Sequence, residues 1–406
     1  MKRRQAIKNL SILPVSGVAL GSSLTLGSAL TSCSSSTKPQ RDVFKELGIR
    51  TFINAAGTYT ILSASTMHDE VMDTIQFSSK KYADINDVQD GVGKKIAELC
   101  HAEAAMVSAG CWSAIVLGTA GVITGTDRNK VAMLPTNTAE LKTEVLVQRS
   151  HARSYARALT HAGAKIVEVE TVEDVRKSIN PKTAMMFFLN ISEPNGLIKY
   201  EEWIALGNEY GIPTMIDIAA DVPPVENLWR FNDMGFSLVT ISGGKGLRGP
   251  QSAGILMGKK DLIAGARLNA CPNDGVGRGM KVNKEEMLGM YIALEKFIKS
   301  DQAEMWKMWE DRLAVIADAV EAIDGVTTSV TVPAIANHTP TLHISWDQER
   351  IKITAPELRV KLQNGDPSIE MRGNRDECAI TAWMMLDGDD KVVASRMAEE
   401  LKSAIA

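Results

Sequence analysis

The sequence predicts an α/β protein with a mostly parallel sheet sandwiched between helices, followed by a smaller α+β domain. Continuous apolar runs recur at TAMMFFL (183–189), IPTMIDI (212–218) and FSLVTIS (236–242). Such runs are typical of strands that are buried on both faces. Helical patterns stand between them, and this alternation favours a parallel sheet covered by helices.

Further segments extend the alternation toward the N-terminus. The other strand candidates are NKVAML (129–134), KTEVLVQ (142–148) and AKIVEVE (164–170). The helix candidates are GVGKKIAELCHAEAA (91–105), SYARALTHAG (154–163), VEDVRKSI (172–179) and YEEWIALGNEYG (200–211). The two kinds of segment alternate, as expected of a chain built from βαβ units.

The pattern changes after residue 283. Residues 284–323 form a long helical stretch that we expect to break near Ser300 and Asp301. The segments that follow are strand-like at TTSVTV (327–332), TLHISW (341–346), PSIEMRG (367–373) and ECAITAWMM (377–385), with helices at APELRVKLQ (355–363) and 391–406. We therefore predict a large domain over 43–290 and a small α+β domain over 291–406.

Composition and charge are those of an ordinary globular protein. Of the 406 residues, 45% are hydrophobic and 23% are charged, and the formal net charge is −4. The length is sufficient for two domains with a sizeable core. A negative net charge gives no support for nucleic-acid binding, so no nucleic acid is expected as a partner.

The first 33 residues have the pattern of an export signal. A basic segment, MKRRQAIKNL, precedes an apolar stretch rich in Gly and Ser over 11–30. Leu30-Thr31-Ser32-Cys33 fits a lipobox, which predicts cleavage before Cys33 and lipidation of its thiol. Pro14 and the many small residues disfavour the alternative, a membrane-spanning signal anchor. We expect an exported, periplasm-facing protein that is held to the membrane only by its lipid.

The export route is left open by the sequence. Arg3 and Arg4 resemble the twin-arginine motif, but Ala6 stands where an aromatic residue is usual. The positive charge that any signal peptide needs is an equal explanation. Residues 34–42 are rich in serine at their start and are predicted to be a tether.

Cysteine spacing gives no sign of a metal site. Apart from Cys33, the chain has four scattered cysteines, with no CxxC pair: Cys100, Cys111, Cys271 and Cys378. Isolated cysteines in a large domain are more often small buried hydrophobes than disulfide partners. We predict four free thiols and no bound metal.

One lysine stands among glycines in ISGGKGLRGPQSAG (241–254), directly after an apolar strand. A Walker A phosphate loop is excluded, because Val239 and Gly246 occupy the positions of its first glycine and its Ser or Thr. The remaining interpretation is that Lys245 itself reacts. A lysine of this kind condenses with the aldehyde of pyridoxal phosphate (PLP), and small neighbours suit a ring and a phosphate close to the backbone.

A PLP site also needs an acid at the pyridine nitrogen and a contact for the ring. Asp217 ends the apolar strand IPTMID, and a buried carboxylate there needs a cationic partner such as a protonated ring. His151 follows the strand EVLVQ and can stack on the ring. Taken alone, an aspartate at a strand end such as Asp217 is more often a capping or turn residue, and a lone histidine such as His151 is more often a surface or core residue.

The phosphate of PLP needs free N–H groups. The turn at Ala109, Gly110 and Cys111 leads into a helix, where unpaired backbone N–H groups point one way. Ser242 can add a hydroxyl to the same phosphate. SAGC alone is also a common helix start. The evidence for a PLP site is therefore the order along the chain, where the turn comes first and is followed by His151, Asp217 and Lys245.

These motifs together resemble fold-type I PLP-dependent enzymes, and within them the selenocysteine synthase-like group, which includes ammonia-lyases. The resemblance rests on INAAGTYT (53–60), residues 87–115, TMIDIAAD (214–221), SGGKGLRGPQSAG (242–254) and GRGMKVNKEEMLG (277–289). It implies the fold-type I PLP-dependent transferase fold. It also implies that Lys245 forms the Schiff base, Asp217 contacts the pyridine nitrogen, His151 lies against the ring, and Ser242 holds the phosphate with the 109–111 turn.

The resemblance also suggests residues that bind substrate. Arg372 stands where fold-type I enzymes often hold a substrate carboxylate, which a guanidinium grips with two hydrogen bonds. A surface arginine on an edge strand explains it equally well. Arg278 in GRGMKV is expected to reach the phosphate or the substrate of a neighbouring subunit, and Asn54 and Thr58 are expected to line the site. Residues 61–65 replace a more glycine-rich run of the ammonia-lyases, so the substrate stays open.

The function expected from this set is a PLP-dependent lyase that removes ammonia from an amino acid or amino-sugar acid, working as a homodimer or a higher homo-oligomer. One alternative is a selenium transferase acting on aminoacyl-tRNA, although an acidic, exported chain argues against tRNA. Aminotransferase or racemase chemistry needs the same cofactor set. A fourth alternative is an exported protein that binds PLP or another ligand without turnover.

Overall fold

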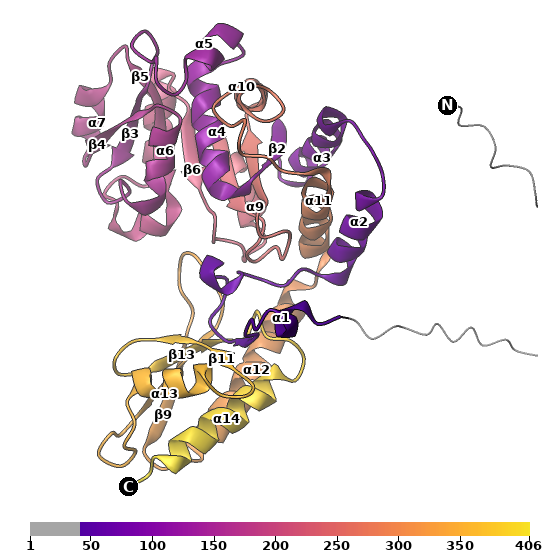
Figure 1. Cartoon of the computed structure of the whole chain (residues 1–406). Coiled ribbons are helices and arrows are strands. Elements are labelled where there is room, and N and C mark those ends of the chain that lie inside the picture. The colour runs from indigo at the N-terminus through magenta and orange to yellow at the C-terminus, as the bar shows by residue number, and fades with distance from the viewer. Residues whose placement is uncertain (1–40) are drawn as a thin grey trace, which may run out of the picture. The chain divides into compact units, whose positions relative to one another are not determined.

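The computed structural model describes residues 41–406, so the predicted signal peptide, Cys33 and most of the tether lie outside the described residues. The described part falls into two units, one ending at Arg50 and one over Thr51–Ala406. The first unit contains the short helix α1 (Val43–Glu46), and the second unit contains the domains described below (Figure 1). No helix among residues 41–406 is long and apolar enough to cross a membrane.

A seven-stranded sheet forms the centre of the large domain. Its order is β2-β8-β7-β6-β5-β3-β4, with parallel pairing from β7 to β4 and antiparallel pairing of β8 to both of its neighbours. The strands are β2 (Ala104–Ser108), β3 (Glu144–Gln148), β4 (Lys165–Val169), β5 (Thr183–Leu189), β6 (Thr214–Asp217), β7 (Leu238–Ser242) and β8 (Gly254–Gly258). The predicted, mostly parallel sheet is confirmed.

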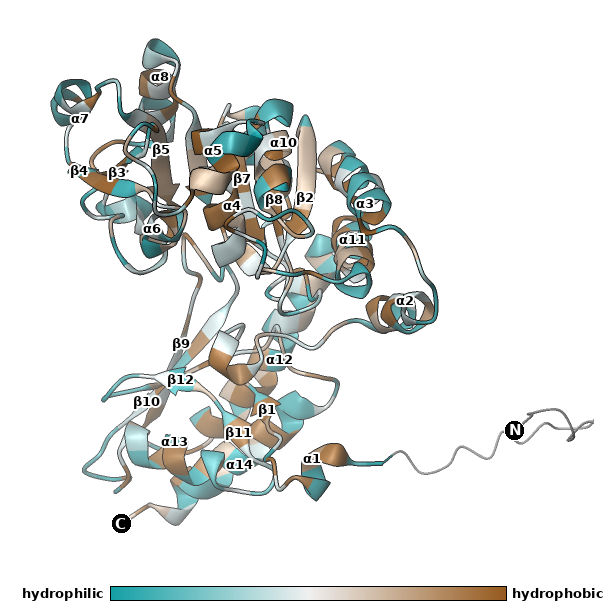
Figure 2. Cartoon of the chain, turned by 45° about the horizontal axis from the view of Figure 1, so that its top comes forward, coloured by the Kyte–Doolittle hydropathy of each residue, from teal (hydrophilic) through white to brown (hydrophobic). Residues whose placement is uncertain are grey.

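Helices cover both faces of this sheet (Figure 1). All seven residues of β5 are buried, because a core lies on each side of it. One core includes α2 (Asp69–Ser79), α3 (Ile85–Leu99), α7 (Val172–Ser178), α8 (Tyr200–Tyr210), α9 (Asn227–Asp233) and α11 (Lys284–Lys299). The other includes α4 (Gly110–Thr124), α5 (Arg128–Met133), α6 (Ala158–His161) and α10 (Lys260–Asn269). In Figure 2 the hydrophobic colour lies on β5, whereas α7 is largely hydrophilic.

Two secondary-structure predictions were wrong. NKVAML (129–134) was expected to be a strand but belongs to helix α5, because the Asp127 side chain caps the helix by accepting a hydrogen bond from the Asn129 N–H. The predicted helix over 91–105 ends at Leu99, and its last residues begin strand β2. Alternation of apolar residues there fits either structure, and pairing with β8 decides for the strand.

The small domain contains a four-stranded antiparallel sheet, in the order β12-β13-β10-β9. Its strands and helices are β9 (Val326–Thr331), β10 (Thr341–Trp346), β12 (Arg372–Gly373), β13 (Cys378–Thr381), α12 (Gln302–Glu321), α13 (Ala355–Gln363) and α14 (Asp389–Ser403). Near the start of the unit, β1 (Ile53–Asn54) pairs in parallel with β11 (Ile369–Glu370). The early segment 53–54 is therefore part of the small domain.

The helical stretch after residue 283 breaks where the sequence predicted it. Helix α11 ends at Lys299, and Asp301 caps α12 by accepting hydrogen bonds from Ala303 and Glu304. The boundary predicted at residue 290 falls inside α11, and the large-domain core continues along this helix to Phe297. The change of domain thus takes place at the break between α11 and α12.

Candidate active site

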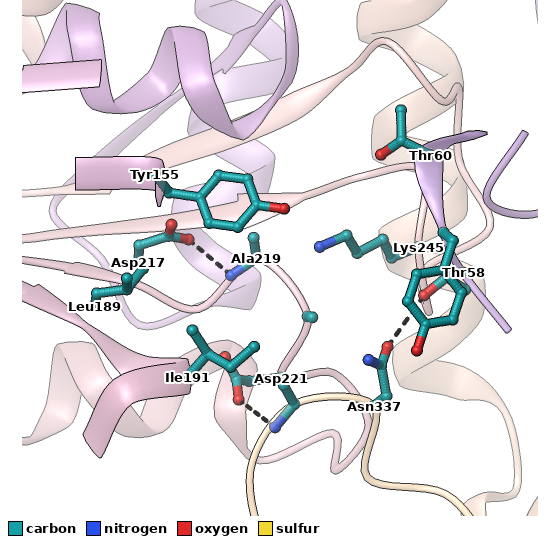
Figure 3. Close-up of a pocket in the computed structure, with 13 residues that line it drawn as sticks. Thr58, Thr60, Tyr155, Leu189, Ile191, Asp217, Ala219, Asp221, Lys245 and Asn337 are labelled. Carbon is teal, nitrogen blue, oxygen red and sulfur yellow. Dashed lines mark hydrogen bonds between the residues drawn. The ribbon is translucent and has the colours of Figure 1, made fainter. Parts of the chain in front are cut away.

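A pocket lies at the carboxyl edge of the parallel strands, and it contains three of the predicted residues, Thr58, Asp217 and Lys245 (Figure 3). Asp217 is the last residue of β6, which pairs in parallel with β7, and Lys245 follows β7 by three residues. Neighbouring parallel strands end at the same edge of a sheet, so these side chains meet there.

Three short 3-10 helices stand around this pocket. They are η1 (Thr60–Leu62), η2 (Ser154–Arg157) and η3 (Asn190–Asn195), and they contribute Thr60, Tyr155 and Ile191 to the lining. Tyr155 is 47% exposed, and its ring lies near Asp217 and Ala219 in Figure 3. Sequence reasoning missed Tyr155, although it lies within the expected helix 154–163.

Asp217 is a carboxylate held in the interior. It is only 3% exposed, and its Oδ1 accepts hydrogen bonds from the Ala219 N–H (2.9 Å) and the Cys111 thiol (3.2 Å). Burial raises the pKa of Asp217, while these hydrogen bonds and the charge of Lys245 act in the opposite direction. A buried carboxylate of this kind is suited to a cationic ligand such as a protonated pyridine ring.

Cys111 has a second role that the sequence did not indicate. Only its backbone was expected to take part in the site, but its thiol also donates toward Asp217 and lies 3.2 Å from Thr240 Oγ1. Burial raises the pKa of the Cys111 thiol well above its ordinary value, so the thiol stays protonated. The four cysteines of the described chain are free, as predicted.

The predicted phosphate turn lies against strand β8. Ala109 precedes helix α4, and Gly110 begins it with a φ of +82°. Gly254 pairs with both Ser108 and Ser242, and a Cβ on Gly254 would lie 2.6 Å from the Gly110 carbonyl carbon. A glycine at 254 is thus required for the helix start to approach the strand. Ala109, Gly110, Cys111 and Ser242 do not line the pocket that contains Lys245, so their contact with a phosphate stays a prediction.

Glycine is required beside Lys245 for a different reason from the one that we expected. We predicted that the glycines leave space for a ring and its phosphate. A Cβ on Gly244 would lie 2.3 Å from the Gln251 Cα, and one on Gly246 would lie 2.0 Å from the Val222 carbonyl oxygen. The glycines are therefore required by close packing of backbone against backbone, which fixes the loop that carries Lys245.

His151 lies outside the pocket lining. It is fully buried, its Nδ1 accepts a hydrogen bond from the Leu189 N–H (3.2 Å), and its ring meets Phe188 edge-on at 4.4 Å. Burial lowers the pKa of His151 to about 4, and the hydrogen-bonding effect of the Ser192 backbone on the ring acts in the opposite direction. His151 is therefore not among the residues that line the pocket, whereas its hydrogen-bond partner Leu189 is.

The predicted substrate residues are divided among several places. Thr58 lines the pocket, and its hydroxyl donates to Asn337 Oδ1 (3.2 Å). Asn54 instead shapes the preceding turn, since its Oδ1 accepts from the N–H groups of Ala56 and Gly57. Its side chain is occupied by the backbone and lies outside the pocket lining.

The two predicted arginines also differ in position. Arg372 lies over the ring of Tyr59, with its Cζ 4.3 Å from the ring centroid, and lines a second pocket that adjoins the first. Arg278 is exposed, and its Nε lies 3.6 Å from Asp274. Within the described chain, Arg278 lines neither of these two pockets.

A loop of the small domain closes one side of the pocket. The Ala336 N–H donates to Asp221 Oδ1 (2.8 Å), and the Asn337 N–H donates to the Ala220 carbonyl (2.7 Å). Asp221 is 4% exposed, and burial raises its pKa to about 6. Sequence reasoning missed the roles of Asp221 and Asn337, although Asp221 closes the motif TMIDIAAD.

With this geometry established, the comparisons with known proteins identify the family. The family model of SelA, L-seryl-tRNA selenium transferase, matches residues 52–328. The chain belongs to this family. The predicted selenocysteine synthase-like group is thereby confirmed, and so is the prediction of a PLP-dependent enzyme.

Individual relatives extend the match over most of the chain. D-glucosaminate-6-phosphate ammonia lyase of Salmonella typhimurium is 25% identical over 342 residues, covering 82% of this chain and 89% of the relative. A 5'-C-glycyluridine monooxygenase-decarboxylase of Streptomyces sp is 24% identical, covering 81% of this chain and 84% of the relative. These two relatives catalyse different reactions, so family membership alone does not give the reaction.

The solved structure of a D-glucosaminate-6-phosphate ammonia-lyase has the same fold. It superposes with a TM-score of 0.79 at 23% identity, covering 90% of this chain and 99% of that structure. The predicted fold-type I PLP-dependent transferase fold is confirmed.

Proposed function

We propose that this protein is a PLP-dependent lyase that removes ammonia from an amino acid or amino-sugar acid. The observation that carries the proposal is that Lys245 and Asp217 face one pocket at the carboxyl edge of the sheet. When bound there, PLP supplies an electron sink that stabilises negative charge at the substrate α-carbon. The relative named for ammonia-lyase activity on D-glucosaminate-6-phosphate supports this choice of reaction.

The residues of the chain would divide the work of holding the cofactor. Lys245 would bind it covalently through Nζ, and the carboxylate of Asp217 would keep a proton on the pyridine nitrogen. The start of α4 and Ser242 would hold the phosphate. The fit rests on the buried acid Asp217, whose pKa is raised by burial and which lines the same pocket as Lys245.

Proton transfer is the step that the chain itself performs. Nζ of Lys245 would be the base placed to accept a proton from the substrate α-carbon. The loop with Ala336 and Asn337 closes one side of the pocket, and this limits the access of water. Loss of a β-hydroxyl group as water would leave an enamine, and hydrolysis of this enamine by one water molecule would release ammonia and the keto product.

Selenium transfer to an aminoacyl-tRNA is the second candidate, and the family match favours it. The formal net charge of −4 disfavours a polyanionic partner, because such a partner is bound mainly through Lys and Arg contacts to phosphates. Salt-dependent binding of seryl-tRNA by the purified protein would favour this candidate over the lyase.

An absorbance spectrum of the PLP-loaded protein tests the cofactor site. We expect a visible band that borohydride shifts and that Lys245→Ala abolishes. A wild-type protein that stays colourless after incubation with PLP would contradict the proposal. Release of ammonia and a keto acid from a panel of amino acids and amino-sugar acids then separates a lyase from a protein that only binds PLP.

We also propose that the protein is exported, anchored through a lipid on Cys33, and assembled as a homodimer or higher homo-oligomer. The lipobox and the basic start of the chain support the first two points. Cys33→Ser should release the protein from membrane fractions, and Arg3→Lys with Arg4→Lys should block export only if the route is twin-arginine. Light scattering of the purified protein measures the oligomer, and a monomer would contradict that part.

A further inference from the structure

A second pocket adjoins the one that contains Lys245. The two share Tyr59, Ala336 and Asn337 in their linings, and the second pocket holds about 690 Å³ of empty space. Most of its other lining comes from the small domain, and we call it the outer pocket. These three residues therefore form the boundary that a substrate bound at Lys245 would cross to reach the outer pocket.

The outer pocket lies on one face of the small antiparallel sheet. Side chains of paired residues point to the same side of a sheet and alternate along each strand. Thr341 pairs with both Thr331 and Thr381, so these three hydroxyl-bearing side chains share a face. The alternate residues Leu342 and Ile344 are fully buried on the opposite side. The face that lines the outer pocket is thus polar.

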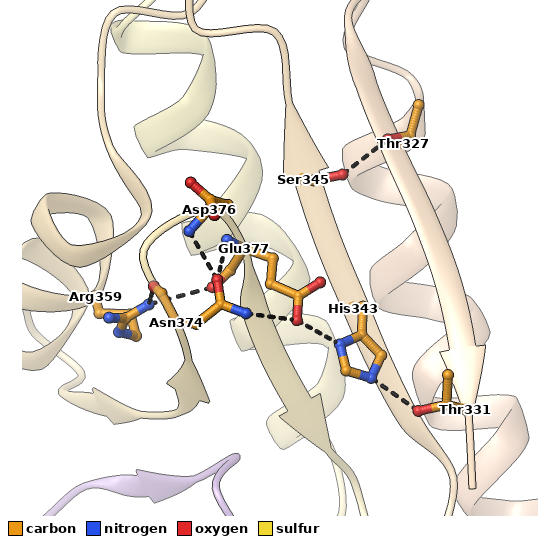
Figure 4. A network of polar contacts seen from close by, with 8 residues as sticks. All are labelled: Thr327, Thr331, His343, Ser345, Arg359, Asn374, Asp376 and Glu377. Atoms are coloured by element: carbon orange, nitrogen blue, oxygen red, sulfur yellow. Dashed lines mark hydrogen bonds and ion pairs between the residues drawn. The ribbon is translucent and has the colours of Figure 1, made fainter.

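A chain of hydrogen bonds fixes one of these hydroxyl groups (Figure 4). His343 Nδ1 lies 3.0 Å from Glu377 Oε1, and His343 Nε2 lies 2.8 Å from Thr331 Oγ1. An ionised Glu377 can only accept, so Nδ1 donates to it. In the neutral ring Nε2 then accepts the Thr331 proton, and the lone pairs of Thr331 Oγ1 stay available to a donor such as a ligand hydroxyl.

Arg372 supplies the charge of the outer pocket. Its guanidinium lies on the Tyr59 ring, and among residues 41–406 no carboxylate forms an ion pair with it. Arg372 pairs with Ala379 across the sheet, as His343 does, so both side chains lie on the polar face. A guanidinium without an acidic partner is suited to a carboxylate or another oxyanion.

We propose that the outer pocket selects a substrate whose chain beyond the α-carbon carries hydroxyl groups, an acidic polyol rather than an apolar amino acid. Thr331 would accept from a hydroxyl of the chain, and Arg372 would bind an anionic group. The inference rests on the proposed function, since it assumes that the amino end reacts at Lys245.

The test compares two kinds of probe, with equal numbers of carbon atoms, for their affinity to the PLP-loaded protein. They are the C2 epimers of a 2-amino-2-deoxyhexonate and both enantiomers of 2-aminohexanoate, which has no hydroxyl groups. Binding is followed through the change in the visible absorbance of the bound cofactor. We expect the better hydroxylated epimer to bind at least about tenfold more tightly, the effect of roughly two neutral hydrogen bonds.

A matched pair of variants locates the effect. Thr331→Val removes the hydroxyl group while keeping the shape, and it should weaken the hydroxylated probe about fivefold and leave 2-aminohexanoate unchanged. Thr327→Val is the control, because Thr327 lies on the same strand, bonds Ser345 (3.0 Å) and does not line the outer pocket. It should change neither affinity.

The outcomes separate the two proposals. Equal affinity for the two probes, or no response to either probe in a protein with the cofactor band, would overturn the assignment of the outer pocket. So would an equal loss for both probes in Thr331→Val, or no loss at all. A wild type without any cofactor band would instead overturn the proposed function itself.

Discussion

The candidate site has two ends that are built in different ways: the cofactor end is the pocket that contains Lys245, and the substrate end is the proposed outer pocket. At the cofactor end, Asp217 and Lys245 follow neighbouring parallel strands, and backbone contacts such as Gly246 to Val222 fix the loop between them. At the substrate end, Thr331, His343 and Arg372 come from separate strands of an antiparallel sheet. The cofactor end therefore depends on the order of parallel strands, whereas the substrate end depends on the register of antiparallel strands.

The largest effect should come from Asp217→Asn, which removes the buried charge at the cofactor end. An amide cannot keep a proton on the pyridine nitrogen, so turnover should fall by at least about a hundredfold, a typical cost of losing a catalytic electrostatic contact. The loss should be the same for every substrate, and steady-state kinetics on two of them checks this. A loss confined to one substrate would mean that the division into two ends is wrong.

Much of the cofactor end could be predicted because it follows from short stretches of sequence. Apolar runs show where β6 and β7 end, and parallel strands bring Asp217 and Lys245 to one edge. His151 was placed against the ring because it also follows a strand. The sequence could not show that His151 is fully buried and accepts a hydrogen bond from the Leu189 N–H, since that depends on how β3 and β5 lie side by side.

The substrate end could not be predicted to the same extent. Thr331 and His343 meet through the pairing of β9 with β10, and nothing in either segment alone indicates it. Asn54 was expected to face the substrate, but its amide is used by the turn that follows. Contacts of these two kinds depend on register and on local backbone geometry, which composition and spacing do not specify.

Asp221 stands where the two ends meet, and its pKa gives a stability prediction. Its pKa is raised from 3.8 to about 6 by burial, so the folded state favours the protonated form. Stability from this group is present below about pH 4 and is lost as the pH rises through 6, by at most about 3 kcal/mol. Asp221→Asn should therefore gain stability relative to the wild type between pH 4 and 7.

Urea denaturation at pH 4 and at pH 7 measures the difference in unfolding free energy between Asp221→Asn and the wild type. Asp73→Asn on the exposed side of α2 serves as control, and its difference from the wild type should stay constant. If the Asp221→Asn difference is also constant with pH, Asp221 is not the buried titrating group described above.

Gly254→Ala tests the predicted phosphate turn, where the start of α4 lies against Gly254 of β8. The added Cβ would lie 2.7 Å from the Cys111 nitrogen, so the strand or the helix start must move. We expect a loss of about 2 kcal/mol in the free energy of unfolding together with weaker retention of PLP on dialysis. Gly279→Ala is the control, because nothing lies within 4 Å of its added Cβ. Retention of PLP unchanged from the wild type would exclude this junction as the phosphate site.

The smallest effect should come from Cys111, and it distinguishes a hydrogen bond from packing. The thiol donates to Asp217 Oδ1, and this bond favours the ionised carboxylate. Cys111→Ala removes the donor, so the pKa of Asp217 rises further and the affinity for PLP should fall about fivefold. Cys111→Ser keeps a donor at nearly the same place and should retain affinity within about twofold. Equilibrium dialysis with PLP measures both variants. If Ser and Ala weaken PLP binding equally, Cys111 acts by filling space and not by holding the charge of Asp217.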